Sequence, residues 1–164
     1  EGVPGRPADV MTTRAAIDDF LAQKRLAVVG VSRNPKDFSQ GLFRELRRRG
    51  YDVVPVNPNG AEVEGERCFP RVQDIAPPVD GALLMTPPET TERVVRDCVE
   101  AGISRIWMHR GGGAGAVSPQ AVALCRETGL QLVPGECPYM FLPGTTLIHR
   151  VHGWCKRLIG SWPR

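Results

Sequence analysis

Residues 26–35 read Leu26-Ala27-Val28-Val29-Gly30-Val31-Ser32-Arg33-Asn34-Pro35, an apolar run that ends at a glycine and continues into polar residues and a proline. A helix-like pattern follows, so the stretch predicts a buried strand, a tight turn and the start of a helix. Gly30 lets the backbone turn sharply and approach a ligand closely, while the amides at a helix start attract an anion. Because Ser32 and Arg33 add a hydroxyl group and a permanent cation, this turn is a candidate phosphate-binding site.

The turn differs from the dinucleotide-binding fingerprint. Positions 30 to 35 read Gly-Val-Ser-Arg-Asn-Pro, where that fingerprint needs Gly-x-Gly-x-x-Gly. An ordinary tight turn uses the same residue types, so this stretch alone leaves a ligand site and a plain turn equally open. The rest of the chain has to decide between them.

Length and composition indicate one soluble domain with its own core, because the chain has 164 residues, of which 41% are hydrophobic and 24% charged. There is no apolar run long enough for a membrane span, and the polar start lacks the apolar block of a signal peptide, so we expect a cytoplasmic protein. The five cysteines form no Cys-x-x-Cys pair, which favours reduced thiols over disulfides or a zinc site. A net charge of +3 would suit a phosphorylated ligand, but so small an excess is common in proteins without one. The arginines at 47–49 favour a solvated helix end over a nucleic-acid patch, so we expect no nucleic-acid partner.

Helical and strand patterns alternate along the chain. Thr12 or Thr13 caps a helix that runs to about Gln23, and a second helix ends at Gly50 after arginines that complement its negative end. Further helices are predicted over 89–101 and 118–129, and strands over 26–29, 52–56, 80–85, 103–108 and 130–134. This alternation predicts an α/β protein with a Rossmann-like parallel sheet of about five strands and helices on both faces.

The loops after the strands carry the candidate ligand residues. Parallel strands bring their carboxyl ends to one edge of the sheet, where ligands bind in a crevice. A nicotinamide dinucleotide site usually has Asp or Glu after the second strand, where Asn57 stands here. The glycine-rich loop 111–115 is equally consistent with an anion cradle, a lid or a linker. At this edge the sequence places Gly30, Asn57, Pro58, Thr86, Pro87, Trp107 and Met108.

Several short pieces occur together in a fixed order: Val28-Val29-Gly30-Val31-Ser32-Arg33-Asn34-Pro35, Gly50-Tyr51-Asp52-Val53-Val54-Pro55-Val56-Asn57-Pro58, Thr86-Pro87-Pro88, Ile106-Trp107-Met108 and Glu136-Cys137-Pro138. With these pieces the chain resembles the stand-alone coenzyme A-binding domain proteins, whose fold is similar to the nucleotide-binding domain of the succinyl-CoA synthetase alpha subunit. The combination is more specific than any single piece. The resemblance implies a CoA-binding domain over 12–144, with a flexible tail at 1–11.

The resemblance also implies which residues bind coenzyme A. The turn at Gly30, Val31, Ser32 and Arg33 would lie near the phosphates. The adenosine would lie near Asn57 and Pro58, and the crevice would be lined by Thr86, Pro87 and Trp107 together with Met108. This chain departs from the family pattern in two places, both near the expected position of the ligand's reactive end. The family usually has a short Trp-Met-Gln-x-Gly link where this chain has His109 to Gly115, and this chain continues beyond its Cys-Pro pair.

Two functions of different kinds follow. The first is a module that binds coenzyme A or acyl-CoA and has no catalytic site of its own. The second is an oxidoreductase dependent on NAD(P) or CoA, or an acyl-transfer enzyme. In that enzyme Cys137 would be a thiolate nucleophile and His109 its base. Buried cysteines are commonly inert, so the binding module is the leading hypothesis.

The segment 145–164 is predicted to form an amphipathic helix and a tail, with Leu147, Val151, Trp154 and Leu158 on one stripe. Such a stripe packs on a second copy of the chain, giving a homodimer, or on the protein's own sheet. Its basic residues also permit contact with a partner or a membrane surface. His149, His152 and Cys155 have a spacing that a metal could use, but the apolar stripe favours packing and we expect no metal.

Overall fold

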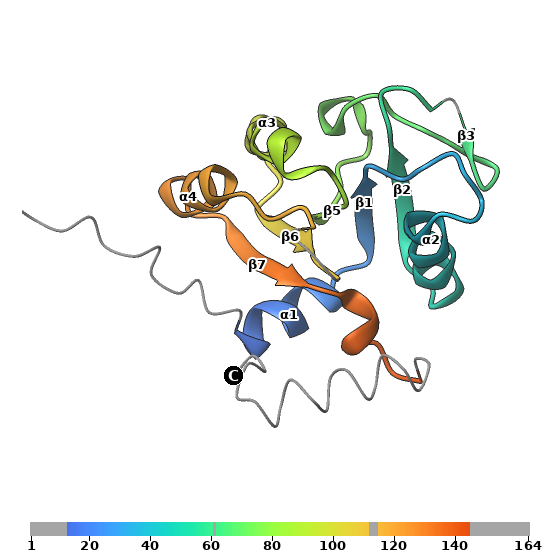
Figure 1. Ribbon diagram of the computed structural model, residues 1–164, viewed down its shortest axis with the longest axis horizontal. Coiled ribbons are helices and arrows are strands. Elements are labelled where there is room, and N and C mark those ends of the chain that lie inside the picture. Colours follow the sequence, from blue (N-terminus) through green and yellow to red (C-terminus); the bar gives the residue numbers. More distant parts are fainter. Residues whose placement is uncertain (1–12, 61, 112–114, 145–164) are drawn as a thin grey trace, which may run out of the picture.

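The computed structural model describes residues 13–60, 62–111 and 115–144. Its centre is a five-stranded sheet in the order β2-β1-β5-β6-β7, and every neighbouring pair is parallel (Figure 1). The strands are β1 (Arg25–Val29), β2 (Asp52–Val56), β5 (Gly81–Leu84), β6 (Arg105–His109) and β7 (Gln131–Glu136). The Rossmann-like α/β fold predicted from the alternating pattern is therefore confirmed.

In the described residues, four α-helices cover the two faces of the sheet, and three of them are capped by a Thr, Asp or Ser side chain. Thr13 caps α1 (Arg14–Leu21) and Asp37 caps α2 (Phe38–Arg48). On the other face lie α3 (Pro88–Glu100) and α4 (Pro119–Glu127), of which the second is capped by Ser118. Figure 1 shows α3 and α4 side by side, and these two helices contact each other.

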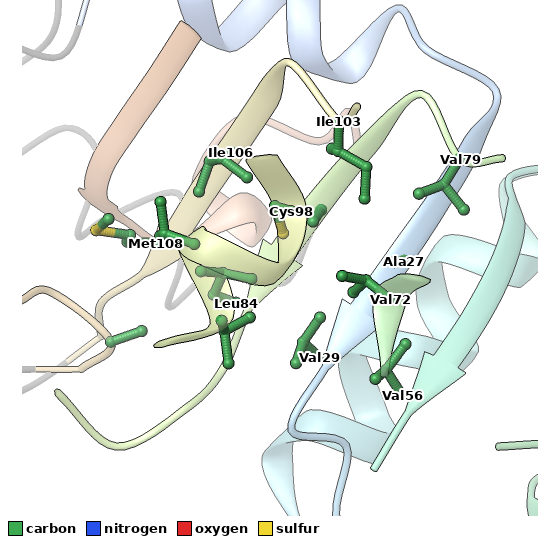
Figure 2. Packing of buried hydrophobic residues seen from close by; sticks show 14 of the residues in the cluster. Ala27, Val29, Val56, Val72, Val79, Leu84, Cys98, Ile103, Ile106 and Met108 are labelled. Carbon is green, nitrogen blue, oxygen red and sulfur yellow. The ribbon is translucent and has the colours of Figure 1, made fainter. Parts of the chain in front are cut away.

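The core forms two layers because successive strand residues point to opposite faces. In β1, Ala27 packs with the layer under α3 and α4, whereas Val28 packs with the layer under α1 and α2. Figure 2 shows Cys98 of α3 among strand side chains that include Ile106 and Met108. All of these side chains are fully buried.

The sequence patterns did not predict a small hairpin formed by β3 (Glu62–Val63) and β4 (Glu66–Arg67). Two-residue strands carry too little alternation to be detected. The hairpin is held against α2 by ion pairs, Arg44 with Glu64 at 2.6 Å and Arg47 with Glu66 at 3.1 Å. Short 3-10 turns at η1 (Val72–Asp74) and η2 (Pro138–Met140) complete the described part of the chain.

The strand order creates a switch point beside β1. The chain passes from β1 to β2 on one side and then crosses to β5 on the other side of β1. In open parallel sheets a crevice forms outside the carboxyl ends of the two strands at such a point. The loops after β1 and β5 therefore mark the place where a ligand site is expected.

Some predictions concern residues outside the described ranges. These are the tail at 1–11, the helix at 145–164 with its dimer contact, and the metal spacing of His149, His152 and Cys155. Among the helices that the structure describes, none has the length and apolar character needed to cross a membrane.

Candidate functional site

A crevice with two lobes lies at the carboxyl ends of β1 and β5. The large lobe, about 740 Å³, lies between the ends of β1 and β2 and the first turns of α3. The small lobe, about 290 Å³, lies between the β1–α2 loop and the end of β6. Gly30, Thr86 and Pro87 line both lobes. The two lobes are therefore adjacent, and these three residues form the wall between them, which we call the waist.

Gly30 is required at the waist for two reasons. Its φ of +91° lies in the region that favours glycine, and a Cβ atom there would stand 2.8 Å from the carbonyl oxygen of Met85. Its amide donates to the carbonyl of Val56 at 2.9 Å, which extends the β1–β2 pairing by one bond. The backbone after β1 can therefore lie directly against the end of β5.

The β1–α2 loop is held in shape by its own side chains. The Ser32 amide donates to Ser39 Oγ at 2.9 Å, and Gln40 Nε2 donates to the Ser32 carbonyl at 2.8 Å. The amides of Val31 and Arg33 donate to no other described residue. Val31 is fully buried and Arg33 is exposed, so of these two amides the one of Arg33 is accessible to an anion.

The start of α2 offers less to an anion than the sequence predicted. The Asp37 carboxylate caps this helix by accepting from the amide and the hydroxyl of Ser39. A carboxylate in that position satisfies an amide that a phosphate would otherwise use. The first turn of α2 therefore has fewer free donors for an anion than the sequence suggested.

Asn57 positions the loop around the waist. Its Nδ2 donates to the carbonyl of Val31 at 2.7 Å, and its Oδ1 accepts from the amide of Asn59 at 2.8 Å. Both polar ends of the side chain are therefore engaged within the protein. Pro58 follows as an exposed residue on the rim of the large lobe.

The large lobe has apolar and charged walls. Its apolar surface comes from β1, β2, η1 and α3, through Val29, Val56, Val72 and Val94. Its charged groups are Arg71, Arg93 and Asp97, of which Asp97 accepts a 2.8 Å hydrogen bond from Gln73 Nε2. Neither arginine was among the residues that the sequence predicted at this site. The helical spacing of Thr90 and Arg93, three residues apart just after β5, was the available signal.

The small lobe is lined by aromatic and apolar groups together with a histidine. Phe38 is 43% exposed, and its ring centre lies 5.2 Å from that of His109 and 5.5 Å from that of Tyr139. Burial lowers the pKa of His109 below its usual value, so the imidazole is neutral at neutral pH. Its Nε2 is buried and has no hydrogen-bond partner among the described residues. The lobe thus combines the apolar side chains of Phe38 and Met85 with a neutral imidazole, and its lining also includes the Asp37 carboxylate and serine hydroxyls.

Six of the ten residues expected to bind the ligand line the crevice, and four do not. Gly30, Ser32, Asn57, Pro58, Thr86 and Pro87 line the lobes. Val31 and Arg33 belong to the loop but line neither lobe, and Arg33 is exposed.

Trp107 and Met108 are fully buried, so the expectation that they line the crevice is wrong. The side chains of these two consecutive β6 residues enter opposite core layers, because both faces of this strand are covered. The indole of Trp107 donates to the carbonyl of Glu136 at 2.8 Å, which satisfies its only donor within the core.

The cysteines of the described residues are buried thiols. Burial raises the pKa of Cys68 and Cys98, and it raises the pKa of Cys125 to about 12. Cys137 is 5% exposed and lines neither lobe of the crevice. Within the ranges that the structure describes, no cluster of His, Cys, Asp or Glu could hold a metal ion.

Comparison with known proteins agrees with this architecture. The alpha subunit of an ADP-forming acetate–CoA ligase from Pyrococcus furiosus is 30% identical over 128 residues, covering 74% of this chain and 28% of that subunit. An uncharacterised protein, YneT of Bacillus subtilis, is 26% identical over 126 residues, covering 76% of this chain and 90% of its own. This chain thus spans only a fraction of the ligase subunit but most of the smaller protein.

The structure of a hypothetical protein from Pyrococcus horikoshii superposes with a TM-score of 0.72 at 30% identity, covering 84% of this chain and 94% of that one. Residues 24–143 match the family described as the CoA binding domain. This match includes all five strands of the sheet and every residue that lines the two lobes. The chain belongs to the CoA binding domain family.

Proposed function

We propose that the crevice binds coenzyme A or acyl-CoA, and that the protein acts as a binding module for this ligand. The observation that carries the proposal is the two-lobed crevice that meets at Gly30 beside the switch point. Coenzyme A has a bulky nucleotide at one end and a narrow pantetheine arm at the other, joined by a pyrophosphate. A crevice with a large lobe, a waist and a small lobe suits that outline.

The distribution of groups supports one orientation of the ligand. The pyrophosphate lies beside the waist along the β1–α2 loop, where the amide of the exposed Arg33 donates to no other described residue. The nucleotide occupies the large lobe, beside Pro58. The pantetheine arm enters the small lobe, where Phe38 and Met85 provide apolar contact.

Two features favour coenzyme A over a nicotinamide dinucleotide and binding over catalysis. Asn57 stands where a carboxylate would hold the ribose hydroxyls of NAD, and its amide is already engaged with Val31. The thiol that an acyl-transfer enzyme would use belongs to Cys137, which is buried away from both lobes. The thiol of Cys137 therefore does not lie in the small lobe, where His109 would have to act as its base.

Isothermal titration calorimetry of the full chain with CoA, acetyl-CoA, NAD and NADP tests the proposal. We expect CoA or acetyl-CoA to bind once per chain and to raise the midpoint of thermal unfolding, because a ligand that binds only the folded state stabilises it. NAD and NADP should do neither. Binding of a nicotinamide dinucleotide in preference to CoA would overturn the proposal.

Release of free thiol from acetyl-CoA tests the enzymatic alternative. We expect no turnover by the protein alone, and unchanged CoA affinity in Cys137→Ala. A turnover that this variant abolishes would identify an acyl-transfer enzyme instead. Mass spectrometry of the native protein as purified adds an independent reading, because a retained ligand identifies itself by its mass.

A further inference from the structure

Two arginines, Arg71 and Arg93, line the large lobe, and neither is among the described residues that line the small lobe. Arg71 immediately precedes η1, and Arg93 lies in α3. Both are exposed, and Arg93 forms no ion pair with another described residue. Arg71 approaches Asp74 at 3.6 Å, a long contact between exposed groups that contributes little. Both guanidinium groups can therefore turn toward a ligand at low cost.

The charges of the two lobes differ in sign. Asp37 is the charged residue of the small lobe, whose described lining contains no lysine or arginine. The large lobe has two cations and one anion, and the anion, Asp97, already accepts a hydrogen bond from Gln73. A ligand that spans both lobes is therefore drawn with its more negative end into the large lobe.

We propose that Arg71 and Arg93 bind the phosphomonoester on the ribose of coenzyme A, so that the protein selects CoA over dephospho-CoA. This inference rests on the proposed function, because it places the adenosine in the large lobe. A phosphomonoester carries between one and two negative charges at neutral pH, and a guanidinium group offers it paired donors. Arg71 directly precedes η1 and Arg93 lies in α3, and these two elements contact each other and share the wall of this lobe.

Calorimetric titration of the full chain with CoA and with dephospho-CoA measures the selection directly. We expect CoA to bind at least about tenfold more tightly than dephospho-CoA. In Arg93→Gln and in Arg71→Gln, CoA affinity should fall about fivefold or more while dephospho-CoA affinity stays within about twofold. Raising the salt concentration should narrow the difference between the two ligands in the unmodified protein.

Arg96→Gln is the matched control, because Arg96 lies on the same helix, pairs with Glu92 at 2.6 Å and lines neither lobe. It should leave both affinities within about twofold. Equal affinity of the unmodified protein for the two ligands would overturn the inference and leave the proposed function intact. Loss of affinity for both ligands alike in the Arg71 and Arg93 variants, with circular dichroism unchanged, would also overturn it. Absence of binding by either ligand would instead contradict the proposed function.

Discussion

Asn57 Nδ2 donates a 2.7 Å hydrogen bond to the carbonyl oxygen of Val31, which joins the carboxyl end of β2 to the loop after β1. The bond adds to the backbone bond from Gly30 to Val56 and to the side-chain bond from Gln40 to Ser32. These bonds fix the loop before any ligand arrives, so less conformational freedom is lost on binding. An asparagine that the sequence assigned to ligand contact thus acts by shaping the waist of the crevice.

Asn57→Asp tests this role, because it keeps the shape of the side chain but replaces its donor with an acceptor. The carboxylate cannot donate to the Val31 carbonyl, and it adds a negative charge near the expected pyrophosphate. We expect the free energy of unfolding to fall by about 1–3 kcal/mol and CoA binding to weaken. Urea unfolding and calorimetry measure the two effects. Asn59→Asp, with the same charge change in the same turn, is the control, and an equal loss of stability there would contradict the role of the bond.

Gly30→Ala tests the close approach at the waist. Gly30 and Gly50 have the same φ of +91°, but an added Cβ meets the Met85 carbonyl at 2.8 Å in the first case and nothing within 4 Å in the second. Gly50→Ala should therefore lower the free energy of unfolding only by the backbone strain, about 1 kcal/mol. Gly30→Ala should lower the free energy of unfolding by at least about 1 kcal/mol more than Gly50→Ala does, and it should abolish CoA binding. Thermal unfolding compares the two variants, and similar midpoints would show that the waist is not tightly packed.

The sequence predicted the sheet well because its strands are short apolar runs ended by glycine, proline or asparagine. β2 was predicted to cover 52–56 and does so, since Asp52 and Asn57 flank its apolar residues. The end of β6 was misplaced: the prediction ended at Met108, whereas the strand extends to His109 and pairs there with Glu136. Trp107 is buried for a different reason, because helices cover both faces of this strand.

Side chains that reach the crevice from outside the strand ends were harder to predict. Arg71 directly precedes η1 and Arg93 lies in α3, so their position along one lobe depends on the packing between these two elements. Hydrophobic periodicity indicates which face of a helix is buried, but it does not indicate what the exposed face overlooks. The capping role of Asp37 likewise depends on where α2 begins, and helix ends are the least certain part of such predictions.

His109 predicts a pH dependence of stability. Burial lowers its pKa in the folded state below the usual 6.5, so below pH 6.5 the unfolded chain binds a proton at this position more readily than the folded one. Stability should therefore fall as the pH drops from 6.5 toward the lowered pKa, by at most about 1.4 kcal/mol per pH unit from this group. In His109→Gln that contribution should vanish. Thermal unfolding between pH 5 and 7.5 checks it, and parallel profiles for the two proteins would contradict the assignment.

Arg33→Glu tests whether the exposed tip of the β1–α2 loop contributes to phosphate binding. Arg33 lines neither lobe, but it follows Ser32 directly, and its backbone amide donates to no other described residue. Replacing its cation with an anion should weaken CoA binding by about 1 kcal/mol or more, roughly fivefold. Lys36→Glu makes the same charge reversal within the same loop at an exposed residue that also lines neither lobe. If Arg33 contacts the phosphates directly, calorimetry should show a clearly smaller loss of CoA affinity in Lys36→Glu than in Arg33→Glu. Equal losses would mean that CoA senses the net charge of the loop and not a contact with Arg33.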